Sequence, residues 1–422
     1  AGPDYIDPSH HTFVTGNASR NLDTWMMGED VCRELFERTA ADADISIIEG
    51  VMGLYDGSID SSGDGSSAHL AKVLNTPVIL VVNVKGAAQS AGAVVMGFRE
   101  FDKEVNLAGV ILNNIASESH YECVKTAIEE SCSVAVLGYL NKDSDITIPE
   151  RHLGLIPSEE KKVSSDLYDK LGQMVIETID TDRLQEIAGS PGDFPDYNKS
   201  IFINRDSSLE VTLAIARDSA FCFYYQDDID LFESMGAEIK LFSPLADKSL
   251  PDGIDGIYIG GGFPELFAER LMKNESMRSS IVEAYKQGAV IYGECGGMMY
   301  LLEKLIDCDG RSFKMSSVHN GTSKMEKRRQ GLGYVIVDVI CDTVISRKGD
   351  TFRAHEFHWS GLQDIPESTF FAYNTMKSNG KRTGVDGICK GNILASYTHI
   401  HFSSNPALAK NMLSSMAERV QI

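Results

Sequence analysis

One short segment of the sequence combines a cysteine with the residues that would expose it. Cys295 follows the apolar run 289–292 and precedes Gly296 and Gly297, after which an apolar segment with helical spacing begins. A strand–turn–helix of this kind presents a nucleophile on a tight turn that needs small neighbours, and a helix N-terminus favours a thiolate. The alternative is a buried structural cysteine at a glycine-rich turn. The flanking glycines favour the nucleophile.

A thiolate nucleophile needs a base and an oxyanion hole, and the sequence offers candidates for both. His399 and His401 are two residues apart, so on a strand they would face the same side. Metal binding by this pair is the weaker interpretation, because no third ligand stands at matching spacing. The oxyanion hole would use backbone N–H groups of three glycines: Gly261, Gly262 and Gly296.

The elements that must position these residues belong to an α/β fold. Apolar, often β-branched runs of strand length alternate with segments of helical spacing, which indicates parallel sheets covered on both faces. The runs of the first half are 45–48, 78–82, 110–112 and 134–138. Those of the second half are 211–216, 238–242, 256–259 and 289–292. Alternating segments between 331 and 401 predict additional antiparallel strands.

The two series of strands are separated by the Gly- and Pro-rich segment 188–195. A chain of 422 residues exceeds what one hydrophobic core usually supports, so we expect two domains. We place the first domain at 1–188, a linker at 189–210 and the second domain at 211–422.

Composition and charge exclude several classes of protein. Hydrophobic residues make up 43% of the chain, which is typical of a folded globular protein. The net charge of −22 and the absence of a basic stripe argue against a nucleic-acid partner. No apolar run approaches the roughly 20 residues that span a membrane. The scattered cysteines indicate reduced thiols and a cytoplasmic protein. A homodimer is compatible with the sequence.

Further segments carry specific combinations of residues. In the second half they are 216–225, 260–265, 294–301, 354–360 and 396–402, and in the first half 2–8, 21–23 and 49–57. Together they resemble the family of glutamine-dependent a,c-diamide synthases that act on cobyrinate or Ni-sirohydrochlorin, over nearly the whole chain. The resemblance implies a P-loop domain similar to dethiobiotin synthetase, followed by a flavodoxin-like class I glutamine amidotransferase domain.

For the second half, the resemblance implies that Cys295 attacks the side-chain amide of glutamine and that His399 acts as base and acid. His401 stands where many class I relatives have a glutamate, so it would align His399 or hydrogen-bond, and the third member of the triad stays open. A flat tetrapyrrole with carboxylates suits aromatic and imidazole side chains, although these could equally be core residues. The candidates are Tyr224, Tyr225, His355 and His358.

For the first half, the resemblance implies a site for ATP with Mg²⁺. The candidates for contact with ATP and an acyl phosphate are Asp4, Tyr5, Asp7, Asp56, Lys85 and Asn113. Glu49, directly after the run 45–48, and Asp7 would hold Mg²⁺, since a carboxylate at the carboxyl edge of a parallel strand is where phosphate-bound Mg²⁺ is held. Turn, cap and solvent-exposed positions are the alternatives for the others.

One feature departs from the family. The sequence contains no G-x-x-x-x-G-K-[ST] motif, although phosphate transfer in this fold uses that loop. Its place would be just before residues 2–8. We therefore expect a P-loop segment to precede Ala1 in the natural protein, and we expect the chain without it not to activate a carboxylate.

The implied reaction is the amidation of two acetate side chains, a and c, of a tetrapyrrole. MgATP would phosphorylate a carboxylate, and ammonia from glutamine would displace the phosphate. Cobyrinate on the route to cobalamin and Ni-sirohydrochlorin on the route to coenzyme F430 of methanogens both fit. A glutamine amidotransferase with another acceptor, such as cobyric acid synthase, and a non-catalytic tetrapyrrole- or nucleotide-binding protein are the alternatives.

Overall fold

The computed structural model describes residues 1–58, 64–142, 150–151, 154–155, 158, 165–190, 192–202 and 209–420. The chain forms two compact units. The first contains Ala1–Asn17 and Cys32–Asn198, and the second contains Ala18–Val31 and Lys199–Ile422. The short segment 18–31 therefore belongs to the second unit, although its sequence neighbours on both sides belong to the first. Residues 191 and 203–208 of the predicted linker lie outside the described residues.

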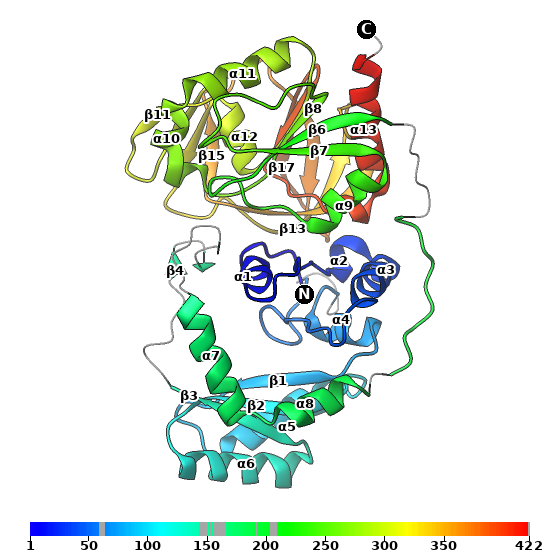
Figure 1. Ribbon diagram of the computed structural model, residues 1–422, viewed down its shortest axis with the longest axis vertical. Helices are drawn as coiled ribbons and strands as arrows, with labels where there is room; N and C mark the ends of the chain where they lie inside the picture. Colours follow the sequence, from blue (N-terminus) through cyan, green and yellow to red (C-terminus); the bar gives the residue numbers. More distant parts are fainter. Residues whose placement is uncertain are drawn as a thin grey trace. The chain divides into compact units, whose positions relative to one another are not determined.

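The first unit is built on a parallel sheet. Its strands, in the order β1-β2-β3, are β1 (Val78–Asn83), β2 (Leu107–Ile115) and β3 (Val136–Asn141) (Figure 1). The predicted runs 78–82 and 110–112 lie within β1 and β2, and 134–138 overlaps β3. Val110, Leu112, Val124 and Ile128 are fully buried between the sheet and its helices, so apolar strands and amphipathic helices share one core.

The helices of the first 190 residues are α1 (Ile6–Thr15), α2 (Thr24–Met27), α3 (Glu29–Ala40), α4 (Ser67–Val73), α5 (Ser90–Phe101), α6 (Glu118–Cys132), α7 (Ser165–Thr178) and α8 (Thr181–Ala188). Two short paired strands, β4 (Glu150–Arg151) and β5 (Gly154–Leu155), complete this part.

The strand predicted at 45–48 is wrong. These residues have no strand assignment, and the side chain of Ile47 is 90% exposed. β-branched residues favour a strand only where a neighbouring strand and a covering layer use them. In the described residues, the sheet of this unit ends at β1 and includes no strand from this segment. Glu49 therefore lies in an extended loop.

The second unit is built on a mixed sheet with the strand order β14-β13-β16-β17-β18-β9-β8-β6-β7 in the described residues. The parallel part consists of β6 (Val211–Ala216), β7 (Ala237–Phe242), β8 (Gly256–Ile259), β9 (Val290–Glu294) and β18 (Ile393–Ser396). The antiparallel part consists of β13 (Gly331–Val339), β14 (Thr351–His358), β16 (Phe370–Met376) and β17 (Arg382–Lys390). The additional antiparallel strands predicted after 331 are confirmed.

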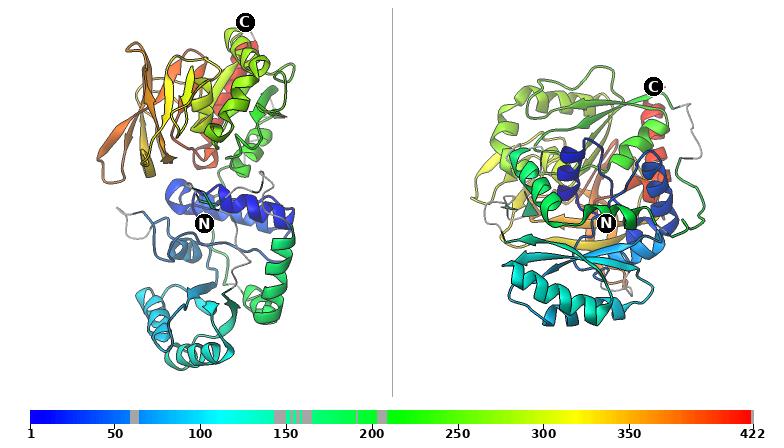
Figure 2. Two further views of the ribbon diagram at one scale, coloured as in Figure 1. Left: turned by 90° about the vertical axis from the view of Figure 1, so that its left-hand side faces the viewer. Right: turned by 60° about the horizontal axis from the view of Figure 1, so that its bottom comes forward.

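A smaller sheet and several helices complete the second unit. The small sheet has β10 (Lys304–Ile306), β11 (Ser312–Lys314), β12 (Thr322–Met325) and β15 (Ser360–Gln363). The helices are α9 (Gln226–Ser234), α10 (Ala268–Lys273), α11 (Glu275–Lys286), α12 (Gly296–Leu301) and α13 (Pro406–Val420), with 3₁₀ turns at Pro264–Phe267 and Phe402–Ser404. The strands of the last third, yellow to orange, gather on one side of this unit (Figure 2).

Parallel pairing places the loops that carry the predicted site at one edge. β8, β9 and β18 are neighbours, and Glu294 at the end of β9 lies opposite Ser396 at the end of β18. The glycine segment follows β8, Cys295 follows β9, and His399 lies just beyond β18. Ligands bind outside the carboxyl ends of the strands in open α/β sheets. Within the described residues, each helix is too short or too polar to cross a membrane.

Candidate active site

Cys295 lies in the predicted strand–turn–helix. β9 ends at Glu294, α12 begins at Gly296, and Cys295 between them has φ 49° and ψ −99°, a conformation that non-glycine residues rarely adopt. The backbone N–H of Cys295 donates to the carbonyl of Ser396 at 2.7 Å. A Cβ at Gly297 would lie 1.9 Å from the carbonyl oxygen of Ile259, so only glycine permits this close packing of helix on strand. The fold therefore holds the cysteine in a strained turn.

His399 is held beside this cysteine by a buried carboxylate. Its Nδ1 lies 2.8 Å from Oε1 of Glu294, and both side chains are at most 2% exposed. The other oxygen of Glu294 accepts hydrogen bonds from the Tyr292 hydroxyl at 2.9 Å and from the Ile400 N–H at 3.3 Å. The carboxylate thus fixes both the orientation and the tautomer of the imidazole.

The charge of His399 follows from these contacts. Burial disfavours the imidazolium, but Cys295, through charge and a hydrogen bond, and Glu294 outweigh it and raise the pKa of His399 to about 10. A proton therefore rests on His399 at neutral pH. Such a proton is available for a leaving nitrogen in acyl transfer.

Glu294 is the residue that sequence reasoning missed as the partner of His399. It stands directly before the cysteine, whereas the family resemblance places a glutamate two residues after the histidine, where this chain has His401. The available signals were its place two residues after the apolar run 289–292 and at the start of segment 294–301. The pairing of β9 with β18, which is not visible in one sequence, brings it to His399.

His401 lies in a separate layer behind the site. Its Nδ1 is 3.2 Å from Oδ1 of Asp228, and its ring stacks on Tyr225 with 4.5 Å between centroids. Burial lowers the pKa of His401 to about 3, so the ring is neutral at physiological pH. The residue that contacts Nδ1 of His399 is therefore Glu294, and His401 contacts Asp228 instead.

The glycine segment after β8 passes beside Cys295 and His399. A Cβ at Gly261 would lie 2.9 Å from Cε1 of His399, and a Cβ at Gly296 would lie 3.1 Å from the backbone nitrogen of Gly262. The carbonyl of Gly261 accepts a hydrogen bond from the N–H of Phe223 at 3.1 Å. The structure thus brings all three predicted glycines to the turn that carries Cys295, where a larger residue would collide with the site.

The four predicted tetrapyrrole residues lie in the amidotransferase unit, and His355 is the one in contact with His399. The Tyr224 hydroxyl donates to the carbonyl of Ala216 and accepts from the N–H of Gly260 at 2.8 Å. The Tyr225 hydroxyl lies 3.0 Å from Nε2 of His355, whose ring stacks on His399 with 4.8 Å between centroids. His358 stacks on Tyr397 at 3.8 Å. Tetrapyrrole binding by these residues stays a prediction.

Asp386 on β17 is a second residue that sequence reasoning missed. Its carboxylate accepts the N–H groups of Tyr397 and Thr398 at 3.1 and 2.9 Å and the Thr398 hydroxyl at 2.6 Å. Asp386 is 5% exposed. It therefore fixes the loop that leads into His399, and it is a positioning residue.

The buried carboxyl of Glu356 on β14 should make the stability of the protein depend on pH. Burial, together with repulsion from Asp386, raises the pKa of Glu356 to about 7. The folded protein then holds a proton that the unfolded chain releases near 4.5, so stability falls as pH rises from about 4.5 through 7. We expect Glu356→Gln to raise the free energy of unfolding by about 2 kcal/mol at pH 8 and little at pH 4.5. Urea unfolding at the two pH values measures this; an equal effect at both would contradict it.

The structure brings several of the predicted acids of the first unit together. Oδ2 of Asp4 accepts the N–H of Asp7 at 2.8 Å, with Tyr5 between them at the start of α1. Oε2 of Glu49 lies 3.0 Å from Nε2 of His11. Burial raises the pKa of Glu49, and electrostatic repulsion by Asp7 raises it further.

This acid pair fits the demands of Mg²⁺ bound to a nucleotide. Such Mg²⁺ takes one or two carboxylates and completes its shell with phosphate oxygens and water. In the part of the chain that the structure describes, no three His, Cys, Asp or Glu side chains are grouped as a protein-only metal site requires. Asp7 and Glu49 would supply the one or two carboxylates that such an ion takes from the protein.

The remaining three candidates of the first unit have different surroundings. Oδ2 of Asp56 accepts the N–H of Gly53 at 3.0 Å, which closes a turn. Lys85 lines a pocket of about 670 Å³, and the neighbouring Asn114 lines it in place of Asn113. The pocket lies where β2 and β3 end, with Tyr139 and Lys142 on its wall. Sequence reasoning missed Asn114, Tyr139 and Lys142.

Two protein families match the chain. A CobB/CobQ-like glutamine amidotransferase domain matches residues 212–407, and an AAA domain matches residues 3–150. The chain is therefore an ATP-binding α/β domain followed by a glutamine amidotransferase domain, as predicted. The AAA match covers residues 3–150, and it does not support the prediction that this domain lacks its P-loop segment.

Three relatives share the name cobyrinate a,c-diamide synthase. The relative from Listeria monocytogenes serovar 1/2a is 44% identical over 98% of this chain and 91% of its own. Those from Caldanaerobacter subterraneus subsp. tengcongensis and Methanothermobacter thermautotrophicus are each 42% identical, over 95% and 97% of this chain and 87% and 90% of their own. This chain belongs to the cobyrinate a,c-diamide synthase family, whose members are glutamine-dependent carbon–nitrogen ligases.

Proposed function

We propose that this protein uses ATP and glutamine to convert the a- and c-acetate carboxylates of cobyrinate into amides. The observation that carries the proposal is the buried contact of Glu294 with His399 beside the strained Cys295, within a chain of this family. The name of the relatives supports the acceptor, and the geometry supports the glutaminase chemistry.

In the glutaminase half-reaction, Cys295 is the nucleophile, His399 transfers protons, and glycine N–H groups stabilise the oxyanion. Sγ of Cys295 attacks the amide carbon of glutamine, and the N–H groups of the glycine segment and of Gly296 face the developing oxyanion. His399 gives its proton to the departing nitrogen, which leaves as ammonia, and a thioester remains on Cys295. Water, deprotonated by His399, then attacks the thioester carbon and releases glutamate.

The synthetase half-reaction belongs to the first unit. Asp7 and Glu49 would hold Mg²⁺, which supplies neutralisation of the phosphate charge when it is bound. Lys85 and Lys142 would contact phosphate or ribose oxygens in the pocket of the first unit. ATP transfers its γ-phosphoryl group to a carboxylate oxygen, and ammonia attacks the acyl carbon and displaces phosphate.

The Mg²⁺ assignment predicts a selective defect. We expect Glu49→Gln to lower ATP-dependent amidation by about 10²-fold, because one of the two carboxylates proposed to hold Mg²⁺ is neutralised. Glutamine hydrolysis should stay within about twofold, because Glu49 lies in the other unit. Both rates are measured on one preparation, with Glu104→Gln, an exposed acid near Lys72, as the control. Normal amidation by Glu49→Gln would remove the metal role.

The acceptor is tested by supplying the full-length protein with MgATP, glutamine and either cobyrinate or Ni-sirohydrochlorin. Both carry the same acetate groups, so both can react, and the ratio of their kcat/KM values identifies the better substrate. Mass spectrometry should show two carboxyl-to-amide conversions on cobyrinate. The proposal fails if neither tetrapyrrole gains an amide.

A further inference from the structure

The segment Ala18–Val31, which we call the strap, is built into the amidotransferase unit although the chain enters and leaves it from the first unit. Asp23 caps α2 by accepting the N–H groups of Trp25 and Met26, both at 2.9 Å, and its second oxygen accepts the Tyr334 hydroxyl at 2.7 Å. Trp25 stacks on Tyr334 with 4.4 Å between centroids. The guanidinium of Arg353 lies over the Trp25 ring, 5.1 Å from its centroid, and donates to the Trp25 carbonyl at 2.7 Å.

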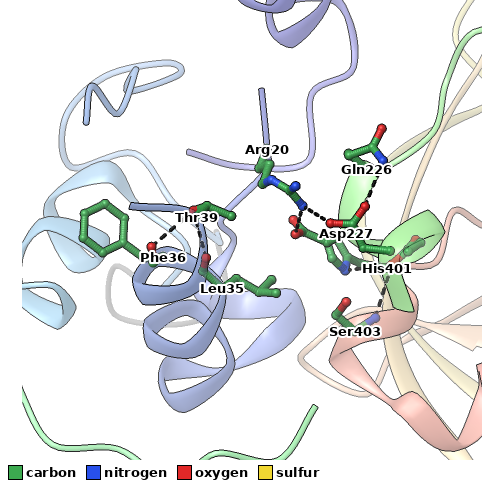
Figure 3. A network of polar contacts seen from close by, with 10 residues as sticks. Arg20, Leu35, Phe36, Thr39, Gln226, Asp227, His401 and Ser403 are labelled. Carbon is green, nitrogen blue, oxygen red and sulfur yellow. Dashed lines mark hydrogen bonds and ion pairs between the residues drawn. The ribbon is translucent and has the colours of Figure 1, made fainter. Parts of the chain in front are cut away.

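The charged end of the strap points into the first turn of α9. Nη1 of Arg20 donates to Asp227 and, at 2.8 Å, to Asp230 (Figure 3). The side chain of Asp227 is fully buried and that of Asp230 is 14% exposed. Solvent therefore cannot stabilise the charge of Asp227, and the guanidinium of Arg20 neutralises it. A buried carboxylate that loses its cation is costly, whereas removal of both partners costs far less.

Asp228, the next residue of α9, connects this ion pair to the ring of His401. Asp228 accepts the N–H of Ser403 at 3.2 Å and faces Nδ1 of His401 at 3.2 Å. The His401 ring nitrogens make no well-directed hydrogen bond to the described residues, so Asp228 and the stacked Tyr225 hold the ring.

Tyr225 links this layer to the catalytic histidine. Its hydroxyl lies 3.0 Å from His355, and His355 pairs with His399 through ring stacking and through two backbone hydrogen bonds of 2.8 and 3.1 Å. Every side chain on this path from Asp227 to His399 is at most 6% exposed. Because these side chains are close-packed and shielded from solvent, a change in the charge at Asp227 displaces its neighbours and alters the position of His399.

We propose that Arg20 is a positioning residue for glutamine hydrolysis: it holds the acidic first turn of α9, and through it the His401–Tyr225–His355 layer against which His399 rests. The glutaminase centre is thus completed by a segment that the chain supplies from within its nucleotide-binding half. Glutamine hydrolysis becomes dependent on a strap whose two ends are covalently joined to that half. The inference rests on the proposed glutaminase function of Cys295 and His399.

Steady-state glutamine hydrolysis by the full-length protein tests this role. We expect Arg20→Gln to lower kcat about tenfold with KM for glutamine within about twofold, because the base is displaced while the substrate contacts remain. Arg20→Lys, which keeps the charge, should recover most of the loss. The double variant Arg20→Gln/Asp227→Asn, which removes the buried charge with its partner, should return kcat to within about threefold of wild type.

The controls separate the possible failures. Arg183→Gln removes an exposed arginine from an ion pair with Glu186 and should leave kcat unchanged. An unchanged kcat in Arg20→Gln, or a loss that Asp227→Asn does not relieve, would overturn the positioning role. If Arg20→Gln does not fold, high activity of the lysine and double variants supports the proposal and low activity of both overturns it. A wild-type protein that matches Cys295→Ala in glutamine hydrolysis would instead refute the proposed function.

Discussion

Replacing Cys295 with alanine is expected to abolish glutamine hydrolysis, with a fall in kcat of at least about 10³-fold. No other group in the elbow can form the thioester, and loss of a nucleophile removes the whole pathway rather than one contact. The turn conformation at φ 49° is tolerated by alanine as poorly as by cysteine, so the fold should be little altered. Glutamate release measured over time gives the rate.

Ammonium provides the matched control for this variant. Free ammonia enters the reaction after the step that Cys295 performs, so Cys295→Ala should still amidate the acceptor when glutamine is replaced with ammonium chloride. Exposed Cys123→Ala, tested in parallel, should behave like wild type with either nitrogen source. Residual glutamine hydrolysis near the wild-type rate would show that the nucleophile lies elsewhere.

Glu294→Gln is expected to lower kcat for glutamine hydrolysis by about 10²-fold or more. The amide keeps the shape but removes the charge that holds His399 at 2.8 Å, and its NH₂ group favours the wrong tautomer of the imidazole. Because Glu294 helps to raise the pKa of His399, its loss should lower that pKa. The alkaline limb of the kcat profile, where His399 loses its proton, should therefore move to lower pH.

Tyr292→Phe is the matched control for Glu294→Gln. It removes the hydroxyl that donates to the other oxygen of Glu294 at 2.9 Å, without touching His399. We expect a loss of less than about tenfold and a smaller shift of the profile. Equal effects of the two variants would indicate a packing role for Glu294 in place of a charge role.

Some residues of the site can be predicted from a single sequence, and others cannot. Cys295 and the glycines around it could be predicted, because a tight turn between a strand and a helix restricts residue types locally. Glu294 could not be assigned to His399, since their contact depends on the parallel pairing of β9 and β18 across about a hundred residues. His401 drew attention by its spacing, yet its ring belongs to the layer formed with Tyr225 and Asp228.

The fold shows the same division. The runs that became β2, β6 and β8 could be predicted because apolar strands that are largely buried on both faces leave a continuous pattern. The run 45–48 has the same composition and forms no strand, because pairing partners decide whether such a run is used. The membership of the strap in the amidotransferase unit depends on Arg20, Asp23 and Trp25, whose partners lie some two to three hundred residues away.

The origin of the nitrogen tests the central claim most directly. The full-length protein is given MgATP, cobyrinate and glutamine labelled with ¹⁵N in its side-chain amide, and the tetrapyrrole is analysed by mass spectrometry. The account predicts a product with two ¹⁵N amides at the a and c positions, and no labelled product from Cys295→Ala. Labelled diamide from Cys295→Ala, or a wild-type protein that releases glutamate without labelling the tetrapyrrole, would contradict it.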